Sequence, residues 1–285
     1  MSSRAVRVYL EMIKIKHSVF ALPFAMVGMM YAANGWPGWR TFLLIVIAMV
    51  SARSAAMAFN RIADAEIDAR NPRTSGRAIP KGALRKGHAS ALCALSCVLF
   101  FAAAALLNRT TLLLAPVALF VLMLYSYTKR FTALCHLFVG LSLGIAPVGA
   151  WVAVTGTLAW APVFWCLAVM FWTGGFDVLY ALQDEEFDRQ NGLKSIPVSL
   201  GRRNAIFVSR IFHLLAASCL VVAGLLVGGG IAYYLGVAFA AVLLIYEQSL
   251  VRTDDISRVD FAFFTLNGYI SVGFFAFALT DVLLR

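Results

Sequence analysis

Charged side chains are scarce in this sequence. Only 13% of its 285 residues are Asp, Glu, Lys or Arg, whereas 61% are hydrophobic. Soluble globular domains carry about 25% charged residues, so this composition excludes a soluble globular protein. Apolar runs of about 20 residues, long enough to cross a hydrocarbon core of roughly 30 Å, recur along almost the whole chain. The sequence therefore predicts an integral membrane protein.

The sequence lacks metal-binding cysteine motifs and a glycine-rich phosphate loop of the P-loop type. The five cysteines lie in or beside apolar runs, and none has the spacing to a histidine that zinc sites show. We therefore interpret them as small residues that pack between helices. Without a P-loop, the sequence does not indicate a nucleoside triphosphate as substrate. The cysteines are Cys93, Cys97, Cys135, Cys166 and Cys219.

The apolar runs predict an all-α bundle of nine transmembrane helices in one domain, residues 1–285. They lack the polar alternation of barrel strands, and only helices and closed barrels span lipid with their backbone groups satisfied. Basic residues precede the first run, but no short apolar core with a cleavage site follows, so we expect that helix to be retained. The runs lie at about 18–34, 41–59, 89–107, 111–128, 132–153, 161–180, 204–227, 230–247 and 260–282.

The basic residues indicate which ends of these helices face the cytoplasm. Sorting the loops by side places 19 of the 24 on one face, which the positive-inside rule assigns to the cytoplasm of an inner membrane. The net charge of +10 is thus mainly a topological signal and does not indicate nucleic-acid binding. The 19 are Arg4, Arg7, Lys14, Lys16, Arg61, Arg70, Arg73, Arg77, Lys81, Arg85, Lys86, Lys129, Arg130, Arg189, Lys194, Arg202, Arg203, Arg252 and Arg258.

The first acidic cluster ends the second predicted helix. Asn60, Asp64 and Asp68 recur at i, i+4 and i+8, which places them within an arc of about 80° on one helix face. Pro72 is expected to stop the helix, because proline lacks a backbone N–H and disfavours helix in the residue before it. Glu66 falls on the opposite face, where we expect it to be solvated.

A second acidic cluster ends the sixth predicted helix. Asp177, Asp184 and Asp188 stand at i, i+7 and i+11, within an arc of about 40° on a regular helix. One such cluster could simply form surface ion pairs with neighbouring arginines. Two clusters, each followed by a basic loop, favour Mg²⁺ sites, because Mg²⁺ is usually held by one or two carboxylates together with a substrate phosphate. Acidic and basic residues on one face suggest a diphosphate.

With these two motifs the sequence resembles the UbiA superfamily of intramembrane aromatic prenyltransferases. The resemblance covers essentially the whole chain and is carried by Asn60, Asp64 and Asp68 with "RNPRTSGR" after them, and by "YALQDEEFDRQNGLKSIPVSLG" at 180–201. It looks closest to the 4-hydroxybenzoate polyprenyltransferase branch, including relatives in the futalosine route to menaquinone. One departure is Arg61, which stands where many relatives carry an aspartate.

The resemblance implies transfer of a polyprenyl group from a polyprenyl diphosphate to an aromatic acid, in a central cavity that opens to the cytoplasmic face. It assigns one Mg²⁺ to Asn60, Asp64 and Asp68 and another to Asp184 and Asp188, with Asp177 as a further candidate ligand. These acids are the expected catalytic residues, since the metals would stabilise the departing diphosphate. The expected diphosphate ligands are Arg73, Arg77, Lys129 and Lys194, and Tyr125 and Tyr180 are candidates for stabilising a prenyl cation.

Arg53 lies seven residues before Asn60, nearly on the same helical face and about two turns deeper in the membrane. A buried arginine needs an anion, and its planar fork suits a carboxylate. We expect it to bind the carboxylate of the aromatic acceptor; the alternative is a structural pair with an acid such as Asp177.

One alternative from another functional class is an ion-coupled transporter, for which acids inside membrane helices are also typical. The acids here cluster toward one face rather than at the midplane, and no inverted repeat with broken helices is recognisable. The sequence leaves the prenyl length and the acceptor open, since a hydroxybenzoate and a futalosine-route aromatic would both present a carboxylate. No obligate protein partner is indicated.

Overall fold

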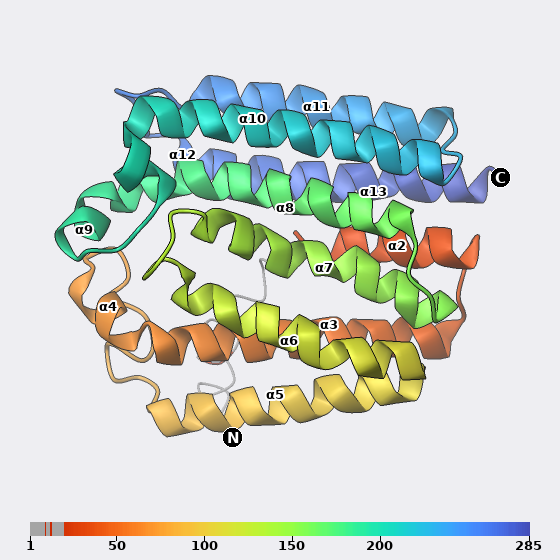
Figure 1. Ribbon diagram of the computed structural model, residues 1–285, viewed down its shortest axis with the longest axis horizontal. Helices are drawn as coiled ribbons and strands as arrows, with labels where there is room; N and C mark the ends of the chain where they lie inside the picture. The colour runs from red at the N-terminus through yellow and green to blue at the C-terminus, as the bar shows by residue number, and fades with distance from the viewer. Residues whose placement is uncertain (1–8, 10–11, 13–19) are drawn as a thin grey trace. The chain divides into compact units, whose positions relative to one another are not determined.

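The computed structural model describes Tyr9, Met12 and residues 20–285, and in these residues it contains helices and no strands (Figure 1). The basic residues Arg4, Arg7, Lys14 and Lys16 lie outside the described residues. The main helices are α2 (Leu22–Ala33), α3 (Trp39–Ala63), α4 (Ala65–Arg70), α5 (Lys86–Leu107), α6 (Arg109–Thr128), α7 (Cys135–Thr155), α8 (Trp160–Ala181), α9 (Glu185–Gln190), α10 (Ile196–Leu226), α11 (Ile231–Leu250), α12 (Val259–Phe261) and α13 (Asn267–Leu283).

In the part of the chain that the structure describes, eight helices are long and apolar enough to cross a membrane. They confirm a multi-pass helical membrane protein and correspond to the second to ninth predicted runs. The predicted run at 18–34 contains α2, whose 12 residues rise about 18 Å and are shorter than a full span. The eight helical segments are Trp39–Ala63, Lys86–Leu107, Arg109–Thr128, Cys135–Thr155, Trp160–Gln190, Ile196–Leu226, Ile231–Leu250 and Val259–Leu283.

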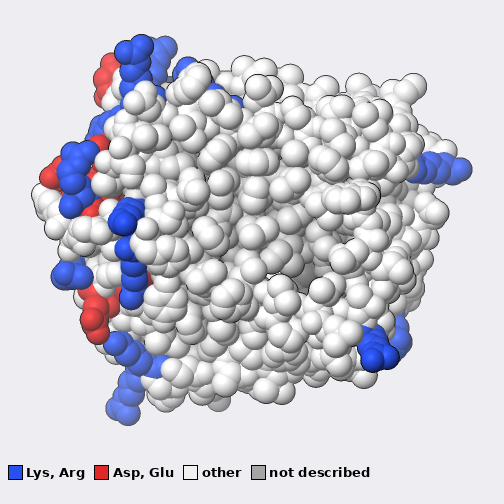
Figure 2. Space-filling view, in the orientation of Figure 1, with Lys and Arg blue, Asp and Glu red and all other residues white. Residues whose placement is uncertain are grey.

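The chain forms two compact units. Among the described residues, the first unit comprises Tyr9, Met12 and residues 40–127 and holds α4, α5 and nearly all of α3 and α6; the second comprises residues 20–39 and 128–285 and holds α2 and α7 to α13. On the face that Figure 2 shows, charged side chains gather at the ends of the long helices, and the surface between these ends is almost entirely uncharged. This distribution suits helices whose flanks lie in lipid.

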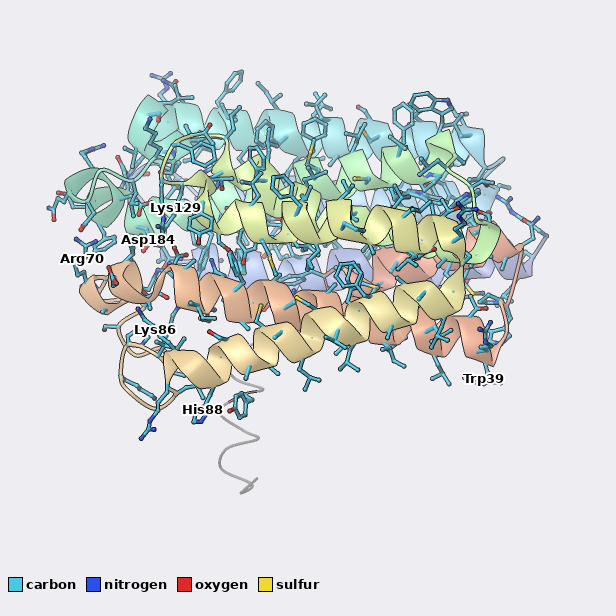
Figure 3. All side chains as sticks on the ribbon, turned by 60° about the horizontal axis from the view of Figure 1, so that its bottom comes forward. Trp39, Arg70, Lys86, His88, Lys129 and Asp184 are labelled. Carbon is cyan, nitrogen blue, oxygen red and sulfur yellow. The ribbon has the colours of Figure 1, made fainter. Side chains whose placement is uncertain are left out.

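Polar residues gather at one end of each unit. Arg70, Lys86 and His88, which flank the first acidic stretch in sequence, lie together at one end of the first unit, and Lys129 and Asp184 lie together at one end of the second unit (Figure 3). Each unit therefore presents a polar end that contains one of the two acidic stretches.

Small residues allow close helix packing in both units. In the first unit, Cys93 on α5 donates a hydrogen bond to the carbonyl oxygen of Ala55 on α3, 3.5 Å away. In the second unit, Gly140 and Gly144 on α7 face the backbone of α8, where a Cβ atom on either glycine would overlap a carbonyl oxygen. This spacing of small residues brings two membrane helices into backbone contact. All five cysteines are free thiols, as expected for residues that only pack.

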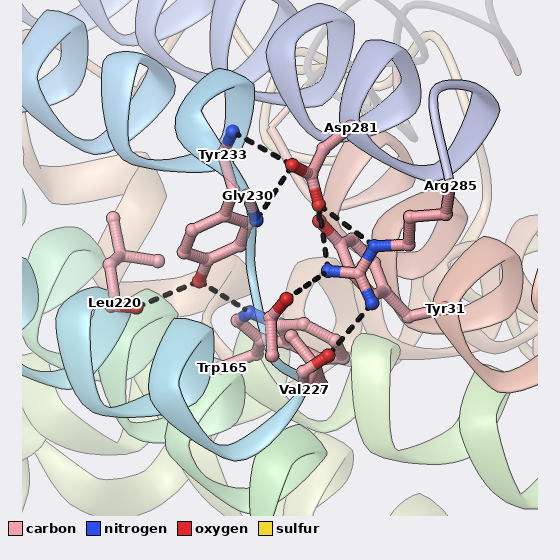
Figure 4. A network of polar contacts seen from close by, with 9 residues as sticks. Tyr31, Trp165, Leu220, Val227, Gly230, Tyr233, Asp281 and Arg285 are labelled. Atoms are coloured by element: carbon pink, nitrogen blue, oxygen red, sulfur yellow. Dashed lines mark hydrogen bonds and ion pairs between the residues drawn. The ribbon is translucent and has the colours of Figure 1, made fainter.

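At the end of the second unit away from α9, Asp281 joins three helices (Figure 4). Its carboxylate accepts hydrogen bonds from the backbone N–H of Gly230, from the hydroxyl of Tyr31 and from Arg285, at 2.8, 2.8 and 2.7 Å. Arg285 also donates to the carbonyl oxygen of Val227 at the end of α10. The pair thereby satisfies backbone groups at a helix start and a helix end, which stabilises the turn between α10 and α11.

Candidate functional site

The two acidic stretches fold into the same local structure. Asp64 follows α3 with φ −96° and ψ 5° and is followed by the six-residue helix α4. Asp184 is the last residue of a short 3₁₀ turn after α8, with φ −101° and ψ 0°, and is followed by the six-residue helix α9. Asp68 and Asp188, the fourth residues of these short helices, are both buried. Each unit therefore contains the same structural motif, in which an aspartate at the end of a long helix is followed by a short helix with a buried aspartate.

The predicted spacing holds better in the first stretch than in the second. The backbone N–H of Asp64 bonds to Asn60 and that of Asp68 bonds to Asp64, so the i, i+4 relationship survives the break between α3 and α4. In the second stretch Leu182–Asp184 form a 3₁₀ turn. The prediction of a regular helix over 177–188 is therefore wrong, because each 3₁₀ residue turns about 120° rather than 100° and rotates Asp184 relative to Asp177.

In the first unit, Asn60 is held by hydrogen bonds on both sides of its amide. Its Nδ2 donates to Asp64 Oδ2 at 2.9 Å and to the hydroxyl of Ser126 at 3.4 Å, and its Oδ1 accepts from Nη1 of Arg61 at 3.3 Å. Asp64 and Asn60 thus share one face, as the spacing predicted. The amide nitrogen, rather than the oxygen, is turned toward the carboxylate.

Asp68 has a partner that sequence spacing did not indicate. One nitrogen of Arg77, Nη1, donates to both carboxylate oxygens of Asp68 at 2.7 Å. The loop that carries Arg77 begins after Arg70, where α4 ends, and Asn71 next to Pro72 is extended, as the proline predicted. The predicted metal ligand and the predicted diphosphate ligand therefore lie in direct contact.

Glu66 behaves as the helix geometry predicted. Its side chain is 89% exposed and lies 3.7 Å from the ammonium group of Lys86. Such an exposed pair adds little stability. Glu66 is thus a solvated neighbour of the acidic cluster and serves below as its matched control.

In the second unit, Asp177 lies next to a histidine. The Nδ1 atom of His136, on α7, is 2.7 Å from Asp177 Oδ2, and the other ring nitrogen, Nε2, accepts a hydrogen bond from the backbone N–H of Ile196 at 3.3 Å. Because Nε2 accepts, the ring is the neutral tautomer with its proton on Nδ1, which it donates to Asp177. His136 thereby joins Asp177 to the start of α10.

The two predicted phosphate-binding lysines of this unit meet through their backbones. The N–H of Lys194 donates to the carbonyl oxygen of Lys129 at 2.7 Å, and the ammonium group of Lys194 donates to the carbonyl oxygen of Phe131 at 3.1 Å. Cys135 Sγ donates to the carbonyl oxygen of Lys194 at 3.5 Å. These contacts hold the loop before α10 against the loop before α7, so two lysines 65 residues apart in sequence share one surface.

Glu185 organises the basic residues that follow the second cluster. Its carboxylate is largely buried and accepts from Arg189 and from Nε of Arg202, both at 2.7 Å. Ion pairing, the alternative considered for these clusters, thus occurs at Glu185 in the second stretch and at Asp68, with Arg77, in the first. Sequence reasoning missed this residue, although an acid directly after Asp184 with arginines four and seventeen residues later was visible.

The predicted aromatic and acceptor residues lie on membrane helices. Tyr180 on α8 packs its ring against Phe263, with centroids 4.3 Å apart, and Phe263 in turn contacts Phe176. Tyr125 lies near the end of α6, and Arg53 lies within α3 about 10 Å, by helix rise, before Asn60. The structure brings Tyr180 into an aromatic cluster of the second unit.

Sequence reasoning also missed Glu247, a fully buried acid on α11. Asn267 donates to Glu247 Oε1 at 3.2 Å and accepts from Nε1 of Trp172 at 2.6 Å, which links α11, α13 and α8. Asn267 also donates to the carbonyl oxygen of Ala262, inside a π-helical turn over Ala262–Leu266. An acid inside an apolar run is a signal that could have identified this network.

The residues present suit Mg²⁺. Among the described residues, no three His, Cys, Asp or Glu side chains form a cluster that could hold an ion by themselves. The first acidic stretch instead offers two aspartates and the second offers three, all with oxygen ligands, and Mg²⁺ commonly takes one or two carboxylates and fills its remaining positions with water and phosphate. The chemistry of the donor set therefore fits.

Comparison with known proteins places these motifs in a family. The sequence model of the UbiA prenyltransferase family matches residues 21–269. A protein named 4-hydroxybenzoate octaprenyltransferase from Vibrio campbellii is 28% identical over 275 residues, which cover 95% of this chain and 96% of the relative.

Solved structures agree. The apo structure of a UbiA homolog from Aeropyrum pernix K1 superposes with a TM-score of 0.85 at 34% identity and covers 94% of this chain and 98% of its own. A UbiA homolog from Archaeoglobus fulgidus bound to DMAPP and Mg²⁺ superposes with a TM-score of 0.71 at 19% identity, over 97% and 99% of the two chains, and shares the fold.

Proposed function

The chain belongs to the UbiA prenyltransferase family, and we propose that it transfers a polyprenyl group from a polyprenyl diphosphate to an aromatic acid such as 4-hydroxybenzoate, with Mg²⁺. The observation that carries this proposal is the structural motif that occurs in both units: a long apolar helix, an aspartate at its end, and a short helix with a buried aspartate. Each copy is followed by a basic loop.

The comparisons support the substrates. The relative from Vibrio campbellii is named for 4-hydroxybenzoate and an octaprenyl group, and the protein from Archaeoglobus fulgidus was solved with a prenyl diphosphate and Mg²⁺. A polyprenyl chain is as apolar as lipid, which explains why such an enzyme consists almost entirely of membrane helices. The product would serve quinone biosynthesis.

The residues proposed to hold Mg²⁺ are Asn60, Asp64 and Asp68 in the first unit and Asp184 and Asp188 in the second. When bound, Mg²⁺ supplies positive charge that stabilises the leaving diphosphate. Asp177 is a weaker candidate ligand, since one of its oxygens already accepts a 2.7 Å hydrogen bond from His136. We propose that His136 orients Asp177 on the acceptor side of the reaction.

The basic residues proposed to bind the diphosphate are Arg73, Arg77, Lys129 and Lys194. As the bond between the prenyl carbon and oxygen breaks, both electrons leave with the diphosphate, and guanidinium and ammonium groups stabilise that charge. The backbone hydrogen bond between Lys194 and Lys129 and the bond from the ammonium group of Lys194 to Phe131 support this proposal, because a loop that is already ordered costs less to order on binding.

The allylic cation then alkylates the acceptor ring beside the phenol oxygen, and the ring loses a proton to become aromatic again. Tyr125 and Tyr180 are proposed to face the cation, and Arg53 to bind the acceptor carboxylate, for which its planar fork is suited. We further propose, from the sequence, that nine spans form one domain with a central cavity open to the cytoplasm. The protein then lies in the inner membrane with its active-site loops on the cytoplasmic side.

The test is an assay of membranes that contain the full chain, with radiolabelled polyprenyl diphosphate and a panel of aromatic acids, with and without Mg²⁺. We expect a prenylated acid only with Mg²⁺, and a loss of product in Asp64→Ala and Asp184→Ala. The matched controls are Glu66→Ala and Glu186→Ala, which remove exposed acids from the same two short helices.

Absence of product with every acceptor would overturn the proposal. Equal product from the aspartate variants and the wild-type protein would retain the activity and overturn the assignment of Asp64 and Asp184 as metal ligands. If no product forms, an ion-coupled carrier becomes the leading alternative, and ion-dependent uptake into vesicles is measured next.

A further inference from the structure

Arg61 is a buried arginine with an incomplete set of partners. It lies in the last turn of α3 with 5% of its surface exposed. Its Nη1 donates to Asn60 Oδ1 at 3.3 Å, and among the described residues no carboxylate forms an ion pair with it. A guanidinium has five N–H donors, so this single hydrogen bond leaves most of them for another acceptor.

A guanidinium that is removed from water without an anion is unfavourable, and native proteins retain such groups where an anion binds. The required acceptor carries several oxygens and negative charge. A phosphate oxygen pair fits this description because the planar fork of arginine donates two parallel hydrogen bonds to it.

The contact with Asn60 directs Arg61 toward the acidic face of α3. Arg61 follows Asn60 by one residue, so an extended side chain would leave the helix about 100° away from it. The hydrogen bond to Asn60 instead folds the guanidinium back, and Asn60 is itself held by Asp64 and Ser126. Arg61 therefore lies beside the proposed Mg²⁺ ligands.

The neighbouring cation differs from Arg61 in one respect. The guanidinium of Arg77 is neutralised by both oxygens of Asp68, whereas Arg61 has no such partner among the residues that the structure describes. Asp64, Asp68 and Arg77 are the charged groups that act on Arg61. The first unit thus holds a positive group that is ready for an anion before Arg77 releases Asp68.

We propose that Arg61 binds the diphosphate group of the prenyl donor through two of its N–H groups, and that it binds the released diphosphate in the same way. This inference rests on the proposed function, since it assigns a further ligand for the same substrate. It makes Arg61 a binding residue for the leaving group, with Asn60 as the residue that positions it.

The test measures binding of inorganic pyrophosphate with Mg²⁺ to the purified full chain in detergent by calorimetry. We expect Arg61→Met to weaken binding by about 10- to 100-fold, as loss of a charge-assisted hydrogen-bonded pair does. The affinity of Arg61→Lys should lie between those of the wild type and Arg61→Met, because lysine keeps the positive charge but lacks the planar guanidinium group. Arg70→Met, which removes an exposed arginine from α4, should bind as the wild type does.

Thermal unfolding separates this role from a structural one. Without ligand, Arg61→Met should unfold at the wild-type temperature or above it, because a buried charge without an anion has been removed, and its stabilisation by pyrophosphate should be smaller. A lower unfolding temperature together with unchanged pyrophosphate affinity would overturn the inference, as would a wild-type protein that binds no pyrophosphate. If Arg61→Met does not fold, the affinity of Arg61→Lys decides.

The two proposals fail separately. Binding of pyrophosphate that depends on Arg61, without any prenylated product, would overturn the proposed function and retain this site. If prenylated product forms but Arg61→Met binds pyrophosphate as the wild type does, the proposed function is retained and the assignment of Arg61 as a diphosphate ligand is overturned. The binding of a prenyl diphosphate, compared with pyrophosphate, tells whether the prenyl chain adds affinity beyond this shared group.

Discussion

Both carboxylate oxygens of Asp68 accept a hydrogen bond from Nη1 of Arg77, each over 2.7 Å. A proposed metal ligand and a proposed diphosphate ligand thus neutralise each other. Binding of Mg²⁺ and diphosphate would replace this one ion pair by two, with the carboxylate on the metal and the guanidinium on the phosphate. The pair therefore keeps a buried acid stable until the substrate arrives.

Arg77→Met tests this exchange. The change leaves the carboxylate of Asp68, which is 4% exposed, without its cation, and we expect the protein to lose about 3 kcal/mol of stability. Prenyl transfer should also fall, because the diphosphate loses a cation. Thermal unfolding in detergent and the membrane assay measure the two effects.

The double variant Asp68→Asn with Arg77→Met is the control for that experiment. It removes both charges, so stability should return toward the wild-type value while activity stays low. An Arg77→Met protein that unfolds at the wild-type temperature would show that the pair contributes nothing to the substrate-free state.

Asn60→Asp should make stability depend on Mg²⁺. The new carboxylate would stand where the amide nitrogen lies 2.9 Å from Asp64 Oδ2, and two like charges at that distance repel unless a cation lies between them. With chelator the variant should unfold below the wild type, and Mg²⁺ at about 100 times its dissociation constant should restore about 2.7 kcal/mol.

The matched control is Asn108→Asp at the start of α6, where Asn108 Oδ1 accepts from the N–H of Thr111 and an aspartate oxygen can do the same. Its unfolding temperature should not respond to Mg²⁺. Equal responses of the two variants would contradict a metal site at Asn60.

His136 offers a matched pair of substitutions. In His136→Asn the amide nitrogen can take the place of Nδ1 and donate to Asp177, whereas in His136→Gln the longer side chain can reach the N–H of Ile196. If orientation of Asp177 is what matters, His136→Asn should keep most of the turnover number and His136→Gln should lose about 10-fold or more.

The reverse order would show that the histidine acts through the loop before α10. Unfolding temperatures of both variants are measured alongside, since a loss of turnover at unchanged stability separates positioning from folding. The Michaelis constant for the aromatic acid shows whether Asp177 acts on acceptor binding or on the chemical step.

Glu185→Gln and Glu186→Gln compare a buried and an exposed acid in the same helix. Glu185 accepts from Arg189 and Arg202 at 2.7 Å, and its side chain is 10% exposed, whereas that of Glu186 is 71% exposed. We expect Glu185→Gln to cost about 2 kcal/mol and Glu186→Gln less than about 0.5 kcal/mol in thermal unfolding. Similar losses would show that Glu185 is effectively solvated.

Several features were predictable because their causes are local. The spans from residue 39 onward follow from the length of each apolar run, and the end of α4 follows from Pro72. The side-by-side placement of Asn60 and Asp64 follows from their spacing of four residues. In each case the determining residues lie within one or a few helical turns of each other.

Other features were not predictable because their causes are distant in sequence. His136 and Asp177 are 41 residues apart, and nothing near either one indicates the other. The 3₁₀ turn at Leu182–Asp184 also has no proline or glycine to announce it. Glu247 and Arg61 were visible as charges near or inside apolar helices, but only packing shows which groups surround them.

The sequence by itself determined a multi-pass helical membrane protein with two acidic stretches of the prenyltransferase type, because hydrophobic length and helical spacing are properties of neighbouring residues. Only the tertiary structure decided which charges neutralise each other: Asp68 with Arg77, and Glu185 with Arg189 and Arg202. It also showed that Arg61 is buried beside Asn60 without a carboxylate partner among the described residues. The physical reason is that an ion pair depends on where folding brings two side chains and how much water it removes from them, and neither can be known from spacing along the chain.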